Sequence, residues 1–359
     1  MPTIASAVDV ADDTIVIAPA RECALANACV ASNLESTAGA FGRHLLHDVY
    51  PARTAHAAAL SLSRLSPGAR LVGGGGYLIV SGDSAIEQQV PHGATVDDVA
   101  AQVASERVRL GVGDECVQVA RWGMGTWGHW LGELLPRAVV VERTYPGRFR
   151  FVVPRHVIDE PSDLWPRILE SLRHFGIDDS RLLTIDDHVD YVFESLHVVD
   201  GIWSDHIPHP FVSESMALGA TPGRSNVAKA YLRRTDSSIR ALANAPEVEA
   251  AFVDAGYTPV TVGLLPFAEQ VDLFSSASHL GSVLGSTLTG LLFSPSGVHV
   301  TTVAPARFGD RFFYGLIQTH TGTLVDVRGR ALVDAGPSGD ERNLPFSIDV
   351  PELRSFLEA

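Results

Sequence analysis

The sequence predicts an α/β protein built from two domains. Short apolar runs alternate with helical patterns over most of the chain, which is typical of parallel strands covered by helices. A chain of 359 residues is also longer than one compact core usually serves. A passage rich in Pro, Gly and Ser, from Ile207 to Ser225, interrupts the alternation and is the predicted linker.

Residues 1–100 are expected to form a β-containing lead-in. Its clearest strand signal is Tyr77–Val80, a short apolar run that follows the four glycines Gly73–Gly76. The glycine run continues into neither a G-x-x-x-x-G-K-[ST] nor a G-x-G-x-x-G pattern at the start of a helix. A turn is therefore predicted there rather than a phosphate-binding loop.

The alternation before the linker predicts a first set of strands and helices. The strands are expected at Cys116–Ala120, Phe149–Pro154, Leu182–Ile185 and Ser195–Val199. A helix is expected over Thr126–Arg137, where Pro136 removes one hydrogen bond and should bend or end the helix near Arg137. A second helix, Trp165–Phe175, is stopped by Gly176.

A second run of β-α units follows the linker and is long enough for a nucleotide-binding half-sheet. Its strands are expected at Ala230–Arg234, Thr258–Val262, His279–Leu284 and Val298–Val303. Its helices are expected at Glu247–Ala255, Phe267–Ala277 and Thr287–Phe293, with a last helix at Pro351–Leu357. The predicted domains are 1–220 and 221–335, and residues 336–359 form a tail whose helix packs back on the body.

Composition restricts the partners and the compartment. The net charge of −15 argues against non-specific binding to nucleic acid or to an anionic membrane. Cys23, Cys29 and Cys116 are too few and too scattered for a disulfide framework or a four-ligand zinc site. The N-terminus has no basic region typical of a secretory signal, and no apolar stretch approaches the ~20 residues of a membrane span. We expect a cytoplasmic protein; peripheral membrane association and the oligomeric state stay open.

The segment Thr126–Arg137 is the first candidate site. On a helix, His129, Glu133 and Arg137 follow at i, i+4 and i+8 and share one face. Trp127 and Trp130 flank that face and suit stacking on a sugar or a base. Buried charge is tolerated mainly where it is paired or functional. The trio could instead only orient the helix, and His-x-x-x-Glu lacks the third ligand that a metal site needs.

A second candidate site follows the later strands. Gly285, Ser286 and Thr287 come directly after one strand and open a helix, whose N–H groups and hydroxyls suit an anion. Four cations lie at and just after the first strand of this half: Lys229, Arg233, Arg234 and Arg240. Ligands bind at the carboxyl edge of parallel sheets, so these cations suit a diphosphate; a solvated surface cluster is the alternative.

Motifs for metal and hydrolase chemistry are absent from the sequence. No D-x-D occurs, which weighs against a sugar-nucleotide enzyme that clamps a metal, and neither G-x-S-x-G nor H-E-x-x-H occurs. Asp205, His206 and His209 could bind a metal in their proline-containing loop. A loop between domains is the preferred interpretation, and no metal or other cofactor is expected.

Four blocks of the sequence resemble glycosyltransferase family 61, a domain also found in capsular polysaccharide biosynthesis proteins. Residues 128–137 resemble its N-W-G-H-W-L-x-E-x-L-P-R block, and Tyr231–Arg234 with Arg240 and Asn244 resembles Y-I-S-R-R…R-x-x-x-N. Leu265–Gln270 and Leu273–Ala277 match L-S-F-x-E-Q…F-x-x-A, and Leu288–Gly297 resembles L-T-N-x-x-F-x-P-x-G. The likeness covers residues 120–320 in the right order. It departs from the family at Leu284, which replaces a histidine, and at Gly290, which replaces an asparagine.

The resemblance implies an inverting, metal-independent glycosyltransferase with two Rossmann-like domains in the GT-B arrangement and a cleft between them. A nucleotide sugar would bind the C-terminal domain, and the acceptor would be a saccharide or glycolipid in bacterial polysaccharide synthesis. His129 or Glu133 would be the general base, with Arg137 setting its pKa or binding substrate. The substrate-binding residues would be Trp127, Trp130, Arg137, Lys229, Arg233, Arg234, Arg240, Gln270, Gly285, Ser286 and Thr287.

Two other classes of function compete with this interpretation. A non-catalytic relative would bind saccharide or a partner synthase and would tolerate loss of His129 or Glu133. The departure at Leu284 keeps that class open, since the position borders the expected donor pocket. A dinucleotide-dependent oxidoreductase would need the G-x-G-x-x-G fingerprint, which the sequence lacks.

Overall fold

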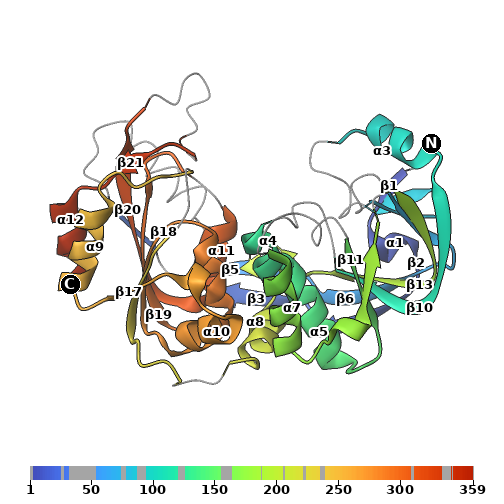
Figure 1. Cartoon of the computed structure of the whole chain (residues 1–359), viewed down its shortest axis with the longest axis horizontal. Helices are drawn as coiled ribbons and strands as arrows, with labels where there is room; N and C mark the ends of the chain where they lie inside the picture. Colours follow the sequence, from blue (N-terminus) through green and yellow to red (C-terminus); the bar gives the residue numbers. More distant parts are fainter. Residues whose placement is uncertain are drawn as a thin grey trace. The chain divides into compact units, whose positions relative to one another are not determined.

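The computed structural model describes residues 3–25, 28–31, 54–73, 78–86, 94–119, 126–154, 164–186, 188–204, 207–220, 224–234, 239–308, 311–333, 341 and 343–358. These residues form a mixed α/β protein with parallel strands in two large sheets, as the sequence predicts (Figure 1). Contacts divide the chain into two compact units. Unit 1 comprises Met1–Arg21, Ala58–Ser204 and His209–Ser215, and unit 2 comprises Glu22–Ala57, Asp205–Pro208 and Met216–Ala359. The predicted ranges 1–220, 221–335 and 336–359 stay a prediction.

The lead-in of unit 1 is rich in strands, which confirms its predicted β content. Its elements are β1 (Thr3–Ala5), α1 (Ala7–Val10), β2 (Ala11–Ala18), β6 (Leu60–Leu65), β7 (Ala69–Val72), β8 (Leu78–Ser81), β9 (Ser84–Ile86) and α3 (Val96–Ala104). Strand β6 pairs antiparallel with β2, and β8 pairs antiparallel with β7 and β9. The predicted strand at Tyr77–Val80 is β8; of the predicted glycine turn, only Gly73 lies within the described residues.

The second half of unit 1 adds four parallel strands. These are β10 (Val108–Gln118), β11 (Arg150–Pro154), β12 (Leu182–Ile185) and β13 (Val189–Asp200), in the spatial order β13-β10-β11-β12. Strand β13 also pairs antiparallel with β6 and β7, so one sheet joins the lead-in to the parallel strands. Between β11 and β12 lie α7 (Leu164–His174) and the 3-10 turn η4 (Asp179–Arg181), and β14 (Trp203–Ser204) follows β13.

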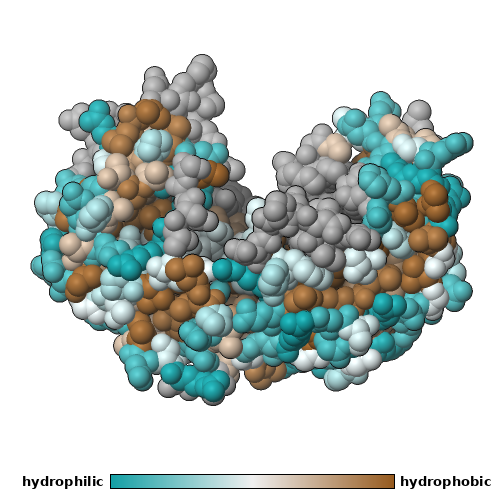
Figure 2. All heavy atoms as spheres, in the orientation of Figure 1, coloured by the Kyte–Doolittle hydropathy of each residue, from teal (hydrophilic) through white to brown (hydrophobic). Residues whose placement is uncertain are grey.

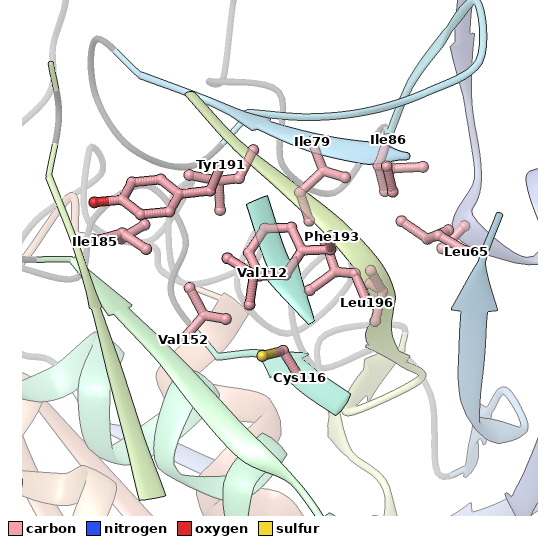
Figure 3. Packing of buried hydrophobic residues seen from close by; sticks show 14 residues of the cluster. Leu65, Ile79, Ile86, Val112, Cys116, Val152, Ile185, Tyr191, Phe193 and Leu196 are labelled. Atoms are coloured by element: carbon pink, nitrogen blue, oxygen red, sulfur yellow. The ribbon is translucent and has the colours of Figure 1, made fainter. Parts of the chain in front are cut away.

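One face of this sheet holds a continuous hydrophobic core. Figure 3 shows side chains from both halves of unit 1 packed together: Leu65, Ile79, Ile86, Val112, Cys116, Val152, Ile185, Tyr191, Phe193 and Leu196. Burial raises the pKa of the Cys116 thiol to about 12, so this cysteine is a packing residue rather than a nucleophile. Figure 2 shows hydrophobic residues among hydrophilic ones over the surface of this unit, and Val16 and Val108 are exposed. Single apolar side chains at a surface are ordinary.

Unit 2 is built on a second sheet in which the strand order is β17-β16-β18-β19-β20-β21, with β4 beside β20. The strands are β3 (Arg21–Ala24), β4 (Ala28–Ala31), β5 (Thr54–Ala57), β15 (Ile207–Pro208), β16 (Lys229–Leu232), β17 (Thr258–Val260), β18 (His279–Val283), β19 (Val298–Pro305), β20 (Thr321–Ala331) and β21 (Phe346–Ser347). Pairing is parallel from β17 to β20 and between β20 and β4, and only β21 pairs antiparallel among the described strands of this sheet. An N-terminal strand therefore completes the C-terminal sheet.

Helices lie on both faces of the second sheet (Figure 1). They are α9 (Ala245–Asp254), the 3-10 turn η5 (Val262–Leu264), α10 (Phe267–Ser276), the 3-10 helix η6 (Ser286–Phe293), α11 (Arg311–His320) and α12 (Val350–Leu357). Helix α12 packs against α9 on one face, where Phe252, Val303 and Leu353 belong to one core cluster. Helices α10 and α11 both contact η6.

The predicted linker Ile207–Ser225 contains helix α8 (Pro210–Ala217), and residues of both units lie within it. Proline favours the first position of a helix, since its missing N–H has no partner there in any case. Val212 and Met216, four residues apart, are fully buried and give α8 its apolar face. The Gly and Ser content of the passage concealed this short amphipathic pattern.

Candidate functional site

A single helix carries the acceptor-side residues that the sequence predicts. It begins as α4 (Trp127–His129), passes through the π-helical segment η3 (Trp130–Leu134) and continues as α5 (Leu135–Thr144). Pro136 has no N–H, so the usual α-helical bond to the Gly132 carbonyl cannot form. The N–H of Leu135 reaches back five residues to the Trp130 carbonyl. Of the two predicted effects of Pro136, a bend or an end near Arg137, the end does not occur, because the helix runs on to Thr144. A π segment of this kind often marks a functional site.

His129 and Glu133 form a close pair on this helix. The His129 Nδ1 atom lies 2.7 Å from Oε1 of Glu133. The Glu133 residue is only 7% exposed, whereas the His129 side chain is 45% exposed. An ionised carboxylate can only accept hydrogen bonds, so an ionised Glu133 would hold the imidazole proton on Nδ1. The Nε2 atom of His129 would then be the proton acceptor of the pair, on the residue that is the more exposed of the two.

Two tryptophans fasten the π segment. The Trp203 indole N–H donates to the Gly132 carbonyl over 2.7 Å, which satisfies the acceptor that Pro136 cannot serve. The Trp130 indole N–H donates to Oγ of Ser171 on α7 over 2.9 Å. Sequence reasoning missed Trp203; the proline shows that Gly132 needs another donor but does not say which residue supplies it.

The other predicted residues of this helix differ in exposure. Trp127 is partly exposed at the start of α4, and Arg137 on α5 is 5% exposed. Trp130 has no exposed surface, so stacking on a substrate would require its ring to leave the core. The roles of these three residues in binding substrate stay predictions, and the burial of Trp130 favours a packing role for that residue.

Strand order gives this helix a specific place in unit 1. Strand β10 lies between β11 and β13, and both pairings are parallel. The chain proceeds from β10 to β11 on one side and returns through β13 on the other, so the order reverses between β10 and β13. Ligands in open α/β sheets bind beyond the carboxyl ends of the strands at such a reversal. The helix of His129 follows β10, and Trp203 follows β13.

Unit 2 has the same kind of reversal, and it brings two predicted cations together. Taken in chain order, its parallel strands are arranged 2-1-3-4-5, so the reversal lies between β16 and β18. Arg234 follows β16, and Gly285 follows β18. A Cβ atom at Gly285 would lie 3.2 Å from Nη2 of Arg240 and 3.7 Å from Nη1 of Arg234. Two guanidinium groups therefore converge on a residue that has no side chain to separate them.

The remaining predicted donor-side residues lie elsewhere or have internal partners. Arg233 makes a two-pronged ion pair with Glu249 on α9. Lys229 is the first residue of β16 and lies at the opposite edge of the sheet, over the Tyr257 ring. Gln270 is buried and donates to the Leu265 carbonyl over 2.9 Å. The structure therefore brings Arg234 and Arg240 together, but not Lys229 or Arg233 with them.

The turn after β18 shows how the departures from the family pattern are accommodated. Gly285 precedes η6, whose first residues Ser286 and Thr287 are exposed and partly exposed. Leu284 is fully buried, so an apolar side chain fills the place of the family histidine. A Cβ atom at Gly290 would lie 2.1 Å from the Phe274 ring, so that ring occupies the space that an asparagine side chain would need.

The described residues include no candidate metal centre. They contain no group of three or more His, Cys, Asp or Glu side chains able to hold a metal ion. Both nitrogens of the fully buried His209 have protein partners, because Nδ1 accepts from the Phe211 N–H and Nε2 donates to the Pro19 carbonyl. Asp205 and His206, the other members of that predicted cluster, lie outside the described residues.

A family model described as Glycosyltransferase 61 matches residues 127–302. The match begins in the helix of His129 and Glu133 and includes Arg234, Arg240 and Gly285. This region is therefore a glycosyltransferase domain. Its family is glycosyltransferase 61, which confirms the resemblance drawn from the sequence blocks. A comparison with curated proteins finds no match. No helix in the described part of the chain is long and apolar enough to cross a membrane.

Proposed function

We propose that this protein is an inverting glycosyltransferase that uses a nucleotide-sugar donor and a saccharide or glycolipid acceptor without a metal. The convergence of Arg234 and Arg240 on Gly285 carries this proposal. The leaving group of such a reaction is a nucleoside diphosphate, whose charge must be stabilised as the glycosidic bond breaks. Planar guanidinium groups bind phosphate oxygens with two N–H groups each, which makes arginine suited to this task in place of a metal ion.

The site in unit 2 offers further donors to the same diphosphate. The N–H groups of Ser286 and Thr287 belong to the first turn of η6, where backbone donors have no partner within the helix. These N–H groups and the exposed Ser286 hydroxyl would supplement the two arginines. Arg233, held by Glu249, is not proposed as a diphosphate ligand.

On the acceptor side, we assign proton removal to His129. Its Nε2 atom takes the proton of an acceptor hydroxyl while that oxygen attacks the anomeric carbon from the face opposite the diphosphate. The bond between the anomeric carbon and the diphosphate oxygen breaks, and its electron pair leaves with the diphosphate. Glu133 keeps the Nδ1 proton in place and stabilises the imidazolium that forms. A single displacement of this kind inverts the anomeric centre.

The donor site is tested by thermal shift with uridine, guanosine, cytidine, adenosine and thymidine diphosphates. At least one should stabilise the wild type, and Arg240→Ala should reduce that shift to the residual part that Arg234 supports. Arg233→Ala is the matched control, because it removes the same charge from a side chain bound to Glu249, and it should keep the shift. Failure of every diphosphate to stabilise the wild type would refute the donor site.

The assignment of the base is tested with the best donor from a hydrolysis and transfer screen. His129→Gln should lower kcat by about 10²–10⁴-fold, the usual contribution of a general base, and Glu133→Gln should lower kcat by a smaller factor; neither should change diphosphate binding much. NMR of the product should show the inverted anomer, and a chelator should leave turnover unchanged. Retention of configuration would overturn the mechanism.

One observation favours a second candidate function, a non-catalytic relative that binds saccharide or a partner. Leu284 and Gly290 replace two polar residues of the family pattern, and both positions are closed by core packing. A binding protein would show no turnover with any nucleotide sugar, and it would keep its ligand when His129 is replaced by Gln.

A further inference from the structure

Arg240 is held by residues that lie beyond the matched glycosyltransferase domain, which ends at residue 302. Its guanidinium carbon lies 4.7 Å from the centroid of the Phe308 ring. Its backbone N–H donates to the Asn343 carbonyl over 3.3 Å. Its φ angle is +55°, a left-handed conformation that side chains other than glycine rarely adopt. Such strain persists only where the surroundings impose it, and it is common in residues that clamp ligands.

Phe308 is itself fixed by a buried network that the proposed reaction does not use. Arg328 is 2% exposed and donates Nη1 to the Pro305 carbonyl over 3.0 Å and to the Phe308 carbonyl over 2.5 Å. The same guanidinium pairs with Asp326 and with the Tyr314 hydroxyl. The turn from Pro305 to Phe308 is therefore fastened through its carbonyl groups, and the Phe308 ring, 1% exposed, has a fixed place.

We propose that Phe308 is a positioning residue for donor binding: its ring is the shelf that holds the Arg240 guanidinium against Gly285 for the donor diphosphate. The Cζ atom of the guanidinium lies over the ring, and Nη2 is the atom that a Cβ at Gly285 would approach to 3.2 Å. A stacked guanidinium keeps its in-plane N–H groups available for phosphate oxygens. This inference rests on the proposed donor site, and it adds a residue that lies outside the family match.

The segment 343–348 holds the backbone around Arg240. The side chain of Asn244 makes two hydrogen bonds to the backbone of Ile348, donating over 2.8 Å and accepting over 3.1 Å. The Phe346 backbone bonds to both Ala241 and Ala243. The backbone of residues 240–244 is thus held by the C-terminal segment, which fixes the point from which the Arg240 side chain extends.

The experiment is a double-mutant cycle read by calorimetric binding of the nucleoside diphosphate that stabilises the wild type, with inorganic pyrophosphate as a second probe. Phe308→Leu keeps an apolar side chain but removes the π face, and it should weaken binding about tenfold, equivalent to about 1.4 kcal/mol. In an Arg240→Ala background the same change should add nothing. Additive losses in the double mutant would overturn the proposal, because Phe308 would then act independently of Arg240.

Two further variants keep the test decisive. Phe252→Leu is the matched control, since Phe252 is fully buried and stacks on Tyr231 rather than on a guanidinium; it should lower stability without changing affinity. Arg240→Lys keeps the charge but not the planar group, and it replaces Phe308→Leu as the test of the proposal if Phe308→Leu fails to fold. Wild-type affinity in Arg240→Lys would overturn the shelf. If the wild type binds none of the probes, the donor site itself is refuted and the shelf with it; binding that Phe308→Leu leaves unchanged refutes only the shelf.

Discussion

Replacing Trp203 by Phe should loosen the π segment on which Glu133 lies. The ring remains, but the indole N–H that donates to the Gly132 carbonyl over 2.7 Å is lost. Pro136 cannot replace it, because a proline nitrogen carries no hydrogen. Gly132 is buried, so its carbonyl oxygen becomes an acceptor without its indole donor inside the protein. A buried polar group left in this state costs about 1–3 kcal/mol, and we expect a loss of stability in that range.

Urea unfolding followed by circular dichroism measures this loss. Trp165→Phe is the matched control: Trp165 lies on α7 and is also partly buried, but its indole nitrogen donates to none of the described residues. A destabilisation by Trp203→Phe no larger than that of Trp165→Phe would refute the reasoning. The variant should also lower kcat more than it lowers diphosphate affinity, because the segment it loosens carries Glu133 rather than the donor site.

Three further predictions concern stability. Burial lowers the pKa of His209 below the value of about 6.5 that the histidine has in the unfolded chain. The stability that the neutral imidazole contributes is complete above that pH and is lost as pH falls through the folded pKa, at up to about 1.4 kcal/mol per pH unit. In His209→Gln, the free energy of unfolding measured with urea should therefore vary less between pH 7.5 and 5. Gly290→Ala should cost about 1–3 kcal/mol or more, because the new Cβ would overlap the Phe274 ring, and a thermal midpoint equal to the wild type would contradict this. Asp190→Ala should cost about 3–5 kcal/mol, since it leaves the partly buried Arg70 without its carboxylate partner at 2.8 Å, whereas unchanged urea unfolding would show that this ion pair contributes little.

Local interactions were the part of the site that sequence reasoning could predict. The spacing of His129 and Glu133 places them one helical turn apart, and the structure confirms that they meet. Neighbouring residues on a helix interact whatever the rest of the fold does. The same reasoning could not decide whether Pro136 bends or ends the helix, because the π-helical bond and the distant tryptophan that replace the missing hydrogen bond depend on the rest of the fold.

The donor side shows why neighbours in sequence are not neighbours in a site. One cluster along the chain contains Lys229, Arg233, Arg234 and Arg240. Lys229 begins strand β16, whereas the arginines follow the end of that strand, and Glu249 binds Arg233. Arg234 and Arg240 meet Gly285, which is more than forty residues away in the sequence. That meeting depends on β16 and β18 lying side by side, a pairing that no local pattern specifies.

The sequence by itself determined the alternation of strands and helices, the strand-rich lead-in, the His129–Glu133 pair and the family to which residues 127–302 belong. These features follow from local hydrogen bonding, from the period of apolar residues and from short motifs. Only the tertiary structure decided the order of the strands, the addition of β4 to the C-terminal sheet, and the convergence of Arg234 and Arg240 on Gly285. The physical reason is that packing and pairing between distant segments depend on the whole chain, whereas periodicity and helix spacing do not.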